Sequence, residues 1–160
     1  MRTIFIEDRK EMDAIIKSCK ICHVAMAGEN VPYVLPMNFA LGEDAVVLHS
    51  AQSGRMWELL QQNPKVCINW TTGDDLAWQD AQVGCSYRMQ SKSVLVEGPV
   101  EFVDACEEKE ACLRMIMAQY SDRAFKFNAP AVKNVGIIKV GIEKISAKAF
   151  GVRVGPRSDR

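Results

Sequence analysis

The residues best suited to chemistry lie together, where an apolar run ends in a short polar stretch. His49 closes the run, and Ser50, Ser53, Gly54 and Arg55 follow it. If a helix begins here, its first backbone N–H groups lack internal partners and favour an anion. The serine hydroxyls add donors, Gly54 permits close approach to the backbone, and Arg55 adds a fixed fork of N–H donors. The stretch therefore predicts a site for a phosphate monoester, which carries roughly −1.5 to −2 charges at neutral pH.

The same stretch also fits an ordinary surface helix that binds nothing. Ser53 is a good N-cap residue, and Arg55 would then be solvated. His49 could simply end a buried strand or, because histidine titrates near neutral pH, take part in proton transfer. Arg88 and Lys92 could form a solvated strand face or bring a second cation to the phosphate. Spacing alone leaves these alternatives open.

A second candidate for chemistry is the C-x-x-C-H motif formed by Cys19, Cys22 and His23. This motif is the attachment signature of c-type haem, a modification made outside the cytoplasm. The N-terminus carries charges where an export signal needs an apolar centre, so we expect a cytoplasmic protein whose six cysteines are thiols. The other cysteines supply no second close pair for zinc. We therefore interpret Cys19 and Cys22 as small buried residues, expect no metal site, and keep a zinc or redox-thiol protein as an alternative.

The composition argues against several other functions. The chain has 160 residues with 20 basic and 20 acidic side chains, so its formal net charge is zero. This balance gives no electrostatic footprint for nucleic acid or for an anionic membrane surface. No apolar run approaches the roughly 20 residues of a membrane span. The motifs of P-loop proteins, dinucleotide-binding proteins, serine hydrolases and zinc proteases are also missing.

Periodic patterns predict the elements that must position these residues. Apolar residues spaced three and four apart predict helices at about 8–19, 53–62 and 104–119. Short or alternating apolar runs predict strands at 23–27, 31–41, 45–49, 65–71, 85–103 and 136–154. Pro32 and Pro36 remove ladder donors, so the second of these strands should have an open edge or a bulge. The rest should be a long loop at 72–84, irregular chain at 120–134 and a frayed tail at 155–160.

Together these elements predict one domain over residues 1–160 that is mainly β with flanking helices (α+β). Asp8 and Glu11 have the spacing of a capping box at the start of the first helix. Six mainly antiparallel strands in a chain of this length favour a closed barrel, because closure removes sheet edges.

Several segments resemble the FMN-binding split-barrel family, the superfamily of pyridoxamine 5′-phosphate oxidase. The matching segments are 19–25, 32–39, 47–60, 63–67 and 93–103. The phosphate-binding stretch and the Asn63-Pro64 pair after its helix are the most specific of them. Within the family, the chain most resembles the nitroimidazole-resistance (Nim-type) branch. The resemblance covers residues 8 to about 120, more loosely to 150, and implies a six-stranded antiparallel split β-barrel.

The resemblance also implies FMN as the cofactor and a set of residues that hold it. The flavin ring and ribityl chain would be lined by Pro36, Met37, Asn38 and Phe39. The phosphate end would be held by His49, Ser50, Ser53, Gly54 and Arg55. Ser93 would form a hydrogen bond to the flavin. In this family FMN lies in a groove between two subunits. The expected state is therefore a homodimer with FMN at the subunit interface.

The chain departs from the oxidase pattern at positions that bear on function. Tyr33 and Asn38 stand where the pattern has Arg and Lys, and Gly54 replaces one of the two basic residues at the phosphate. The Trp- and Arg-containing C-terminal segment that binds substrate in the oxidase is missing. These departures from the oxidase pattern therefore argue against pyridoxine-phosphate oxidase activity.

We expect an FMN-dependent oxidoreductase that reduces a small electron-poor acceptor such as a nitroaromatic. A reduced nicotinamide or another donor would supply the electrons. His49 and Tyr33 are the candidate catalytic residues, because each could reach a bound flavin or substrate. Trp78 and the 72–84 loop could cover the substrate side or form a mobile connection. The alternative is a barrel that binds flavin or haem without turnover.

Overall fold

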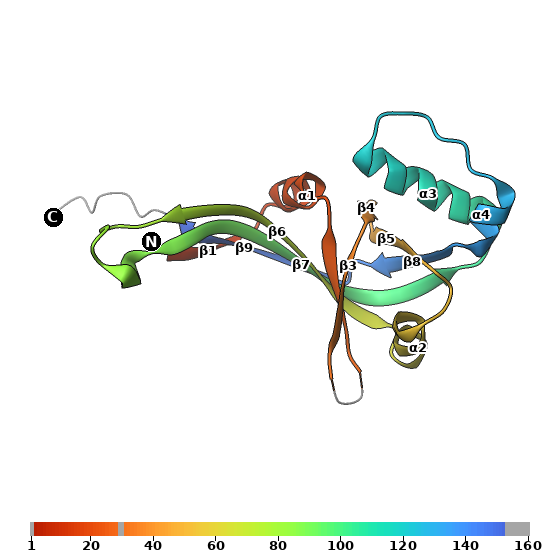
Figure 1. The fold of residues 1–160 in the computed structure, drawn as a ribbon, viewed down its shortest axis with the longest axis horizontal. Helices are drawn as coiled ribbons and strands as arrows, with labels where there is room; N and C mark the ends of the chain where they lie inside the picture. The colour runs from red at the N-terminus through yellow and green to blue at the C-terminus, as the bar shows by residue number, and fades with distance from the viewer. Residues whose placement is uncertain (1, 29–30, 153–160) are drawn as a thin grey trace. The chain divides into compact units, whose positions relative to one another are not determined.

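The chain divides into two compact units that interleave along the sequence. The computed structural model describes residues 2–28 and 31–152, which form nine strands and four α-helices (Figure 1). The first unit comprises the N-terminal segment up to Cys19, Trp70–Val94 and the chain from Ser146 onward. The second comprises Lys20–Asn69 and Leu95–Ile145. That the whole chain is one domain stays a prediction, and the predicted frayed tail lies outside the described residues.

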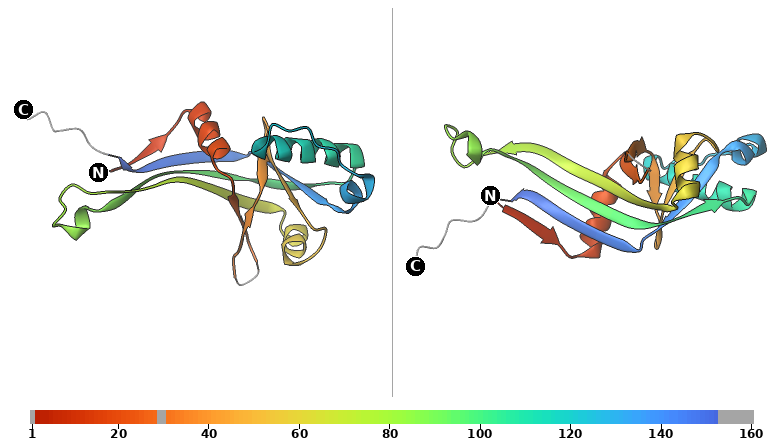
Figure 2. Two further views of the ribbon diagram at one scale, coloured as in Figure 1. Left: turned by 45° about the horizontal axis from the view of Figure 1, so that its top comes forward. Right: turned by 90° about the horizontal axis from the view of Figure 1, so that it is seen from below.

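The first unit is built on one short strand, one helix and parts of three long strands. These elements are β1 (Arg2–Ile6), α1 (Arg9–Ser18), β6 (Lys65–Ala77), β7 (Arg88–Val103) and β9 (Lys144–Val152). β1 runs antiparallel beside β9, with Ile6 opposite Ala147 (Figure 2). In the part of the chain that the structure describes, no helix is long and apolar enough to cross a membrane.

The second unit holds a curled antiparallel half-barrel of seven strands, in the order β3-β2-β6-β7-β8-β5-β4. Its other elements are β2 (Cys22–Met26), β3 (Tyr33–Met37), β4 (Phe39–Leu41), β5 (Ala45–Ser50), β8 (Gly136–Gly141), α2 (Arg55–Gln62), α3 (Cys106–Tyr120) and α4 (Ala129–Asn134). β3 and β4 stand at opposite ends of this order, although a single residue, Asn38, separates them in the chain. The sheet must therefore curl until its two edges approach each other at Asn38.

The predicted fold class is correct, but the predicted six-stranded closed barrel is not. The half-barrel has seven strands, and β1 and β9 extend the sheet to nine among the described residues. The run at 31–41 is two strands, because the chain passes at Asn38 from β3, which pairs with β2, to β4, which pairs with β5. The run at 136–154 likewise divides into β8 and β9. The described pairing stops at β3 and at β4, so the barrel stays open between them.

Local signals explain where other element boundaries agree or differ. The first helix is confirmed: the Asp8 side chain caps it by accepting a hydrogen bond from the Lys10 N–H at 3.0 Å. The predicted loop at 72–84 is partly strand, since β6 continues to Ala77. The predicted irregular segment at 120–134 contains α4, whose N-cap Asn128 accepts from the Ala131 N–H at 2.8 Å. An asparagine followed closely by proline was the signal for that helix.

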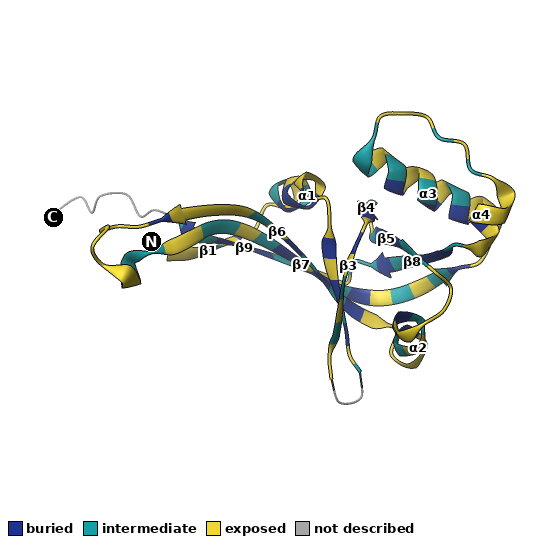
Figure 3. Cartoon of the chain, in the orientation of Figure 1, coloured by how far each residue is buried: buried dark blue, intermediate teal, exposed yellow. Residues whose placement is uncertain are grey.

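An apolar core packs the half-barrel against α3. Buried strand residues meet the buried face of α3 in one cluster, formed by Ala40, Val47, Val103, Cys112, Ile116 and Ile137 (Figure 3). At the end of α3, the Tyr120 hydroxyl accepts from the Phe39 N–H at 2.9 Å and donates to the Lys20 carbonyl at 3.0 Å. The phenol thereby holds the chain beside Asn38, where β3 gives way to β4.

Candidate functional site

Three segments of the second unit line one open pocket: β3 with Asn38, the end of β5, and the loop that leads into α2. The cavity measures about 450 Å³. Nine of the predicted site residues line it, namely Tyr33, Pro36, Met37, Asn38, His49, Ser50, Ser53, Gly54 and Arg55. The fold thus brings together residues from three separate elements that the sequence had singled out.

Two predicted site residues lie outside this pocket. Phe39 is fully buried, and its side chain belongs to the apolar interior rather than to the pocket lining. Ser93 lies on β7 within the first unit and is also not among the lining residues. The strand alternation explains Phe39: it begins β4 facing inward, whereas Asn38 before it is exposed.

The loop enters α2 through a glycine with an unusual backbone conformation. Gly54 is the N-cap of α2 with φ +99°, and no side chain caps the helix. The prediction that Ser53 caps this helix is therefore wrong, because the helix begins one residue later than a Ser53 cap requires. A Cβ at Gly54 would meet nothing within 4 Å, so the backbone angle rather than lack of space requires glycine. The first N–H groups of α2 are left for water or a ligand.

His49 stands at the end of β5, opposite Ile137 of β8. Its side chain is half-buried, and this burial lowers the pKa of His49 below the ordinary value of 6.5. Burial disfavours the charged imidazolium, since its water shell is partly lost. At neutral pH the ring is therefore uncharged and offers the pocket one N–H donor and one nitrogen acceptor.

The lowered pKa of His49 predicts a pH dependence of stability. Because the unfolded chain, with a pKa near 6.5, binds the proton more readily than the folded one, stability from this group is complete above that value. It decreases as the pH falls from 6.5 toward the folded pKa. We expect His49→Gln to reduce the loss of stability over this window, as measured by urea unfolding at a series of pH values. His23→Gln, at the exposed histidine of β2, is the control, and an equal effect there would contradict the assignment.

Trp57 holds the loop in place and Gly136 makes room for its ring, and no sequence pattern had indicated either residue. The Trp57 indole N–H donates to the Ser50 hydroxyl oxygen at 2.9 Å, and that hydroxyl donates to the Ala51 carbonyl at 2.7 Å. The indole stacks on Phe102 with ring centroids 4.5 Å apart. Gly136 makes room for it, because a Cβ there would lie 2.3 Å from the Trp57 ring. Ser50 therefore orients the loop with the hydroxyl that was expected to face the phosphate.

Gln52 ties the same loop to α4. Its side-chain nitrogen donates to the carbonyls of Lys133 and Val135, at 2.7 and 2.9 Å. The buried Lys109 ammonium also donates to the Val135 carbonyl, at 2.9 Å. Carbonyls at a helix C-terminus lack internal partners, so these two donors satisfy them. The loop is thus fixed from both sides before any ligand binds.

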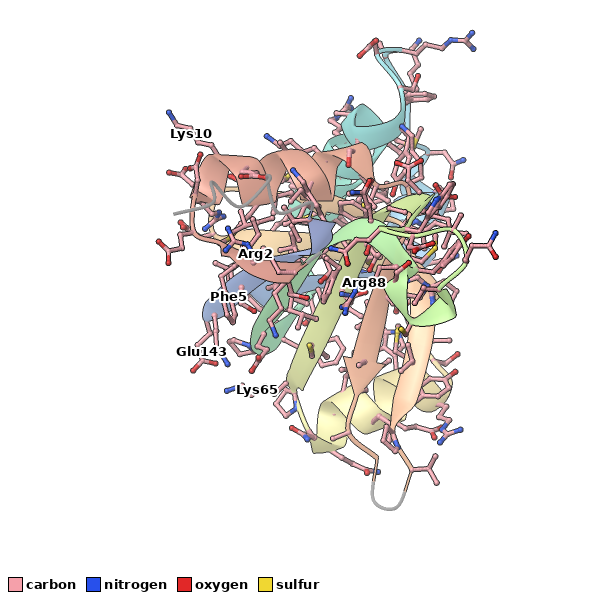
Figure 4. All side chains as sticks on the ribbon, turned by 90° about the vertical axis from the view of Figure 1, so that its left-hand side faces the viewer. Arg2, Phe5, Lys10, Lys65, Arg88 and Glu143 are labelled. Carbon is pink, nitrogen blue, oxygen red and sulfur yellow. The ribbon has the colours of Figure 1, made fainter. Side chains whose placement is uncertain are left out.

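Arg88 and Lys92, the two residues predicted as a possible second cation for the phosphate, belong to the first unit. Lys92 forms an ion pair with Glu11 at 2.7 Å within the first unit. Arg88, at the start of β7, belongs to the same unit (Figure 4). In the second unit, Lys65 pairs with Glu143 at 2.8 Å (Figure 4). Among the described residues that line the pocket, Arg55 is the one lysine or arginine.

The cysteine motif forms no metal centre within the described chain. Cys19 is buried and its thiol donates to the Ile15 carbonyl at 3.4 Å, while the buried Cys22 thiol donates to the Met37 carbonyl, also at 3.4 Å. Burial raises the pKa of Cys19, which disfavours the thiolate that metals and redox chemistry need. No group of three or more His, Cys, Asp or Glu side chains is placed to hold a metal in residues 2–28 and 31–152.

Comparison with known proteins agrees with the resemblance found in the sequence. The model of a family described as pyridoxamine 5′-phosphate oxidase matches residues 8–149. A solved structure from Bacteroides thetaiotaomicron, provisionally assigned as a 5-nitroimidazole antibiotic resistance protein, is 39% identical. Its match covers 92% of this chain and 87% of that one, with a TM-score of 0.84. A comparison with curated protein sequences gave no match.

More distant solved structures share the fold. A flavocytochrome from Azotobacter vinelandii is 23% identical over 98% of this chain and 72% of its own, with a TM-score of 0.79. A FAD and haem binding protein from Mycobacterium smegmatis is 15% identical over 93% and 73%, with a TM-score of 0.81. At these identities the likeness concerns the backbone arrangement alone.

Proposed function

Because the chain belongs to the pyridoxamine 5′-phosphate oxidase family, we propose that the pocket between β3, β5 and α2 binds FMN. The observation that carries this proposal is the start of α2, where a helix N-terminus without a side-chain cap and Arg55 line the same pocket. A helix N-terminus favours an anion, and a guanidinium binds phosphate through paired hydrogen bonds. The cavity of about 450 Å³ is within the usual size of small-molecule sites. The donor set therefore fits a phosphate group.

Each lining residue then has a role in holding the cofactor. Ser53, the backbone at Gly54 and the Arg55 guanidinium would bind the phosphate. Pro36, Met37 and Asn38 would line the flavin ring and ribityl chain, supported from the core by Phe39. Ser50 would hold the phosphate end through its bond with Trp57. The hydrogen bond from Ser93 to the flavin stays a prediction, since Ser93 lies in the other unit.

We infer further that the protein is an oxidoreductase for a small electron-poor acceptor, including nitroaromatics, with a reduced nicotinamide or another reductant as donor. The 39% identity with the protein provisionally assigned to 5-nitroimidazole resistance supports this acceptor class. A bound flavin would supply the electron or hydride transfer. The chain's part is to orient the reactants and to move protons. His49 and Tyr33 both line the pocket, and the uncharged His49 can hold or release a proton there.

The proposed active state is a homodimer with FMN at the subunit interface. In the first unit, large apolar side chains near the turn between β6 and β7 are between 41% and 54% exposed, namely Leu76, Trp78, Val83 and Met89. Trp78 stacks on Tyr87 with ring centroids 5.3 Å apart. Exposed apolar side chains gathered in one region are typical of interaction surfaces. This surface supports association with a second copy of the chain.

The visible absorption spectrum of the purified protein tests the cofactor. We expect a flavin spectrum, with FMN released into the supernatant on heat denaturation, and a dimer in sedimentation of the same sample. If the released pigment is FAD, the pocket is still a flavin site, but the proposal that its flavin is FMN is contradicted. A Soret band without flavin would favour the haem-binding alternative. A protein that stays colourless after incubation with FMN would overturn the proposed site.

A further inference from the structure

The guanidinium of Arg55 lies over the ring of Tyr33. The Arg55 Cζ atom lies 4.4 Å from the ring centroid. Tyr33 is the first residue of β3 and Arg55 is the first residue of α2, and both line the pocket. Because Tyr33 pairs with Met26 in the antiparallel ladder, the sheet fixes the backbone from which its ring projects. The contact thus couples a sheet edge to the start of the proposed phosphate site.

This contact orients the arginine without using its hydrogen-bonding groups. Among the described residues, the Arg55 side chain contacts the Tyr33 ring and forms no ion pair or hydrogen bond. A carboxylate partner would neutralise the charge and occupy the N–H fork. An aromatic face attracts the cation while leaving the five N–H donors in the guanidinium plane free. Arg55 is therefore held in place and still able to bind an anion.

The position of Arg55 matters because the described residues that line the pocket include no other lysine or arginine. Gly54 occupies a left-handed backbone conformation that side chains rarely adopt, which disfavours a basic residue there. Asn38 is neutral, and no second lysine or arginine is among the lining residues. A free arginine side chain loses rotamer entropy when it binds an anion. A guanidinium held beforehand binds phosphate at a smaller entropic cost.

We propose that Tyr33 is a positioning residue, whose ring holds Arg55 toward the phosphate and thereby sets the preference of the pocket for phosphorylated over unphosphorylated flavins. This inference rests on the proposed function of the pocket. It gives Tyr33 a role that needs the aromatic ring and not the hydroxyl group. It also assigns the discrimination between FMN and riboflavin to a pair of residues from two elements.

The test compares Tyr33→Leu with Tyr33→Phe on the apoprotein, using quenching of flavin fluorescence. We expect Tyr33→Leu to weaken FMN binding about threefold to thirtyfold, the range of an exposed to a desolvated cation–π contact. Riboflavin binding should stay within a factor of about two, since riboflavin has no phosphate. Tyr33→Phe should bind both flavins like the parent protein. In an Arg55→Gln background, Tyr33→Leu should have no further effect on FMN.

Three outcomes would overturn the inference. The first is that Tyr33→Phe weakens FMN binding as much as Tyr33→Leu does. The second is that Tyr33→Leu weakens the binding of FMN and of riboflavin equally. The third is that Tyr33→Leu weakens FMN binding by the same factor in the Arg55→Gln background. Phe127→Leu is the matched control and should leave FMN binding unchanged, because it removes the ring that the Arg114 guanidinium lies over and neither residue lines this pocket.

A second readout separates this inference from the proposed function. The Arg55 side-chain N–H resonance should be shifted upfield by the Tyr33 ring in the parent protein and in Tyr33→Phe, but not in Tyr33→Leu. Titration with inorganic phosphate should move that resonance, and should need more phosphate in Tyr33→Leu. If the parent protein binds no flavin, the proposed function fails, and these spectra alone decide the role of Tyr33. An unshifted resonance, or equal phosphate titrations, would overturn it.

Discussion

Arg55→Gln is expected to weaken FMN binding about 10- to 150-fold and to leave riboflavin binding nearly unchanged. Hydrogen bonds to a charged group are each worth about 1.5–3 kcal/mol, and roughly 1.4 kcal/mol corresponds to a factor of ten. Arg55 is the one lysine or arginine among the described residues of the pocket, so no other described lining residue of this chain can replace its charge. The helix N-terminus remains and should retain part of the affinity.

The measurement is a fluorescence titration of apoprotein with each flavin. Arg123→Gln is the matched control, because Arg123 is an exposed arginine of the same unit that does not line this pocket. Thermal unfolding should show no large change in either variant, since both side chains are exposed. Equal affinities for FMN in Arg55→Gln and the parent protein would contradict the placement of the phosphate at this end of the pocket.

Gly54→Ala is expected to lower the free energy of unfolding by about 1–3 kcal/mol and to weaken FMN binding. The φ of +99° at Gly54 lies in a region that residues with a Cβ rarely adopt, and holding one there costs energy of this order. To avoid the strain, the loop must change its conformation. The first N–H groups of α2 would then be displaced from the phosphate.

Gly84→Ala is the matched control for this variant. A Cβ at Gly84 also meets nothing within 4 Å, and Gly84 has no positive φ. The two variants therefore add the same methyl group to open space and differ in the backbone angle. Urea unfolding and FMN titration compare them directly. A loss of stability as small as that in Gly84→Ala would mean that the loop at Gly54 is not constrained as described.

Elements that depend on neighbours in the chain could be predicted from the sequence. The helix after Asp8 follows from its cap and the periodic apolar face, and both are local properties. The order of β5, polar loop and α2 is local for the same reason. Pro36 lies in β3 at the end of the sheet order, as the missing ladder donor predicts. The resemblance to the pyridoxamine 5′-phosphate oxidase family is carried by these same segments and is confirmed.

Features that depend on distant residues could not be predicted. The run at 31–41 looked like one strand, because nothing local shows that β3 and β4 join opposite edges of the sheet. Composition also made 72–84 look like a loop, although pairing extends β6 into it. In both segments, hydrogen bonds to the partner strands override the local pattern, and the segment's own residues do not specify those partners.

The same division holds for the candidate site. The sequence by itself determined the residue types at the proposed phosphate site, because a helix start, a glycine and an arginine are encoded within a few positions. The tertiary structure decided which contacts those residues make. The Ser50 hydroxyl accepts a hydrogen bond from the Trp57 indole, and the Arg55 guanidinium lies over the Tyr33 ring. These contacts join β5 to α2 and β3 to α2. Their geometry comes from the curl of the sheet, which no local pattern specifies.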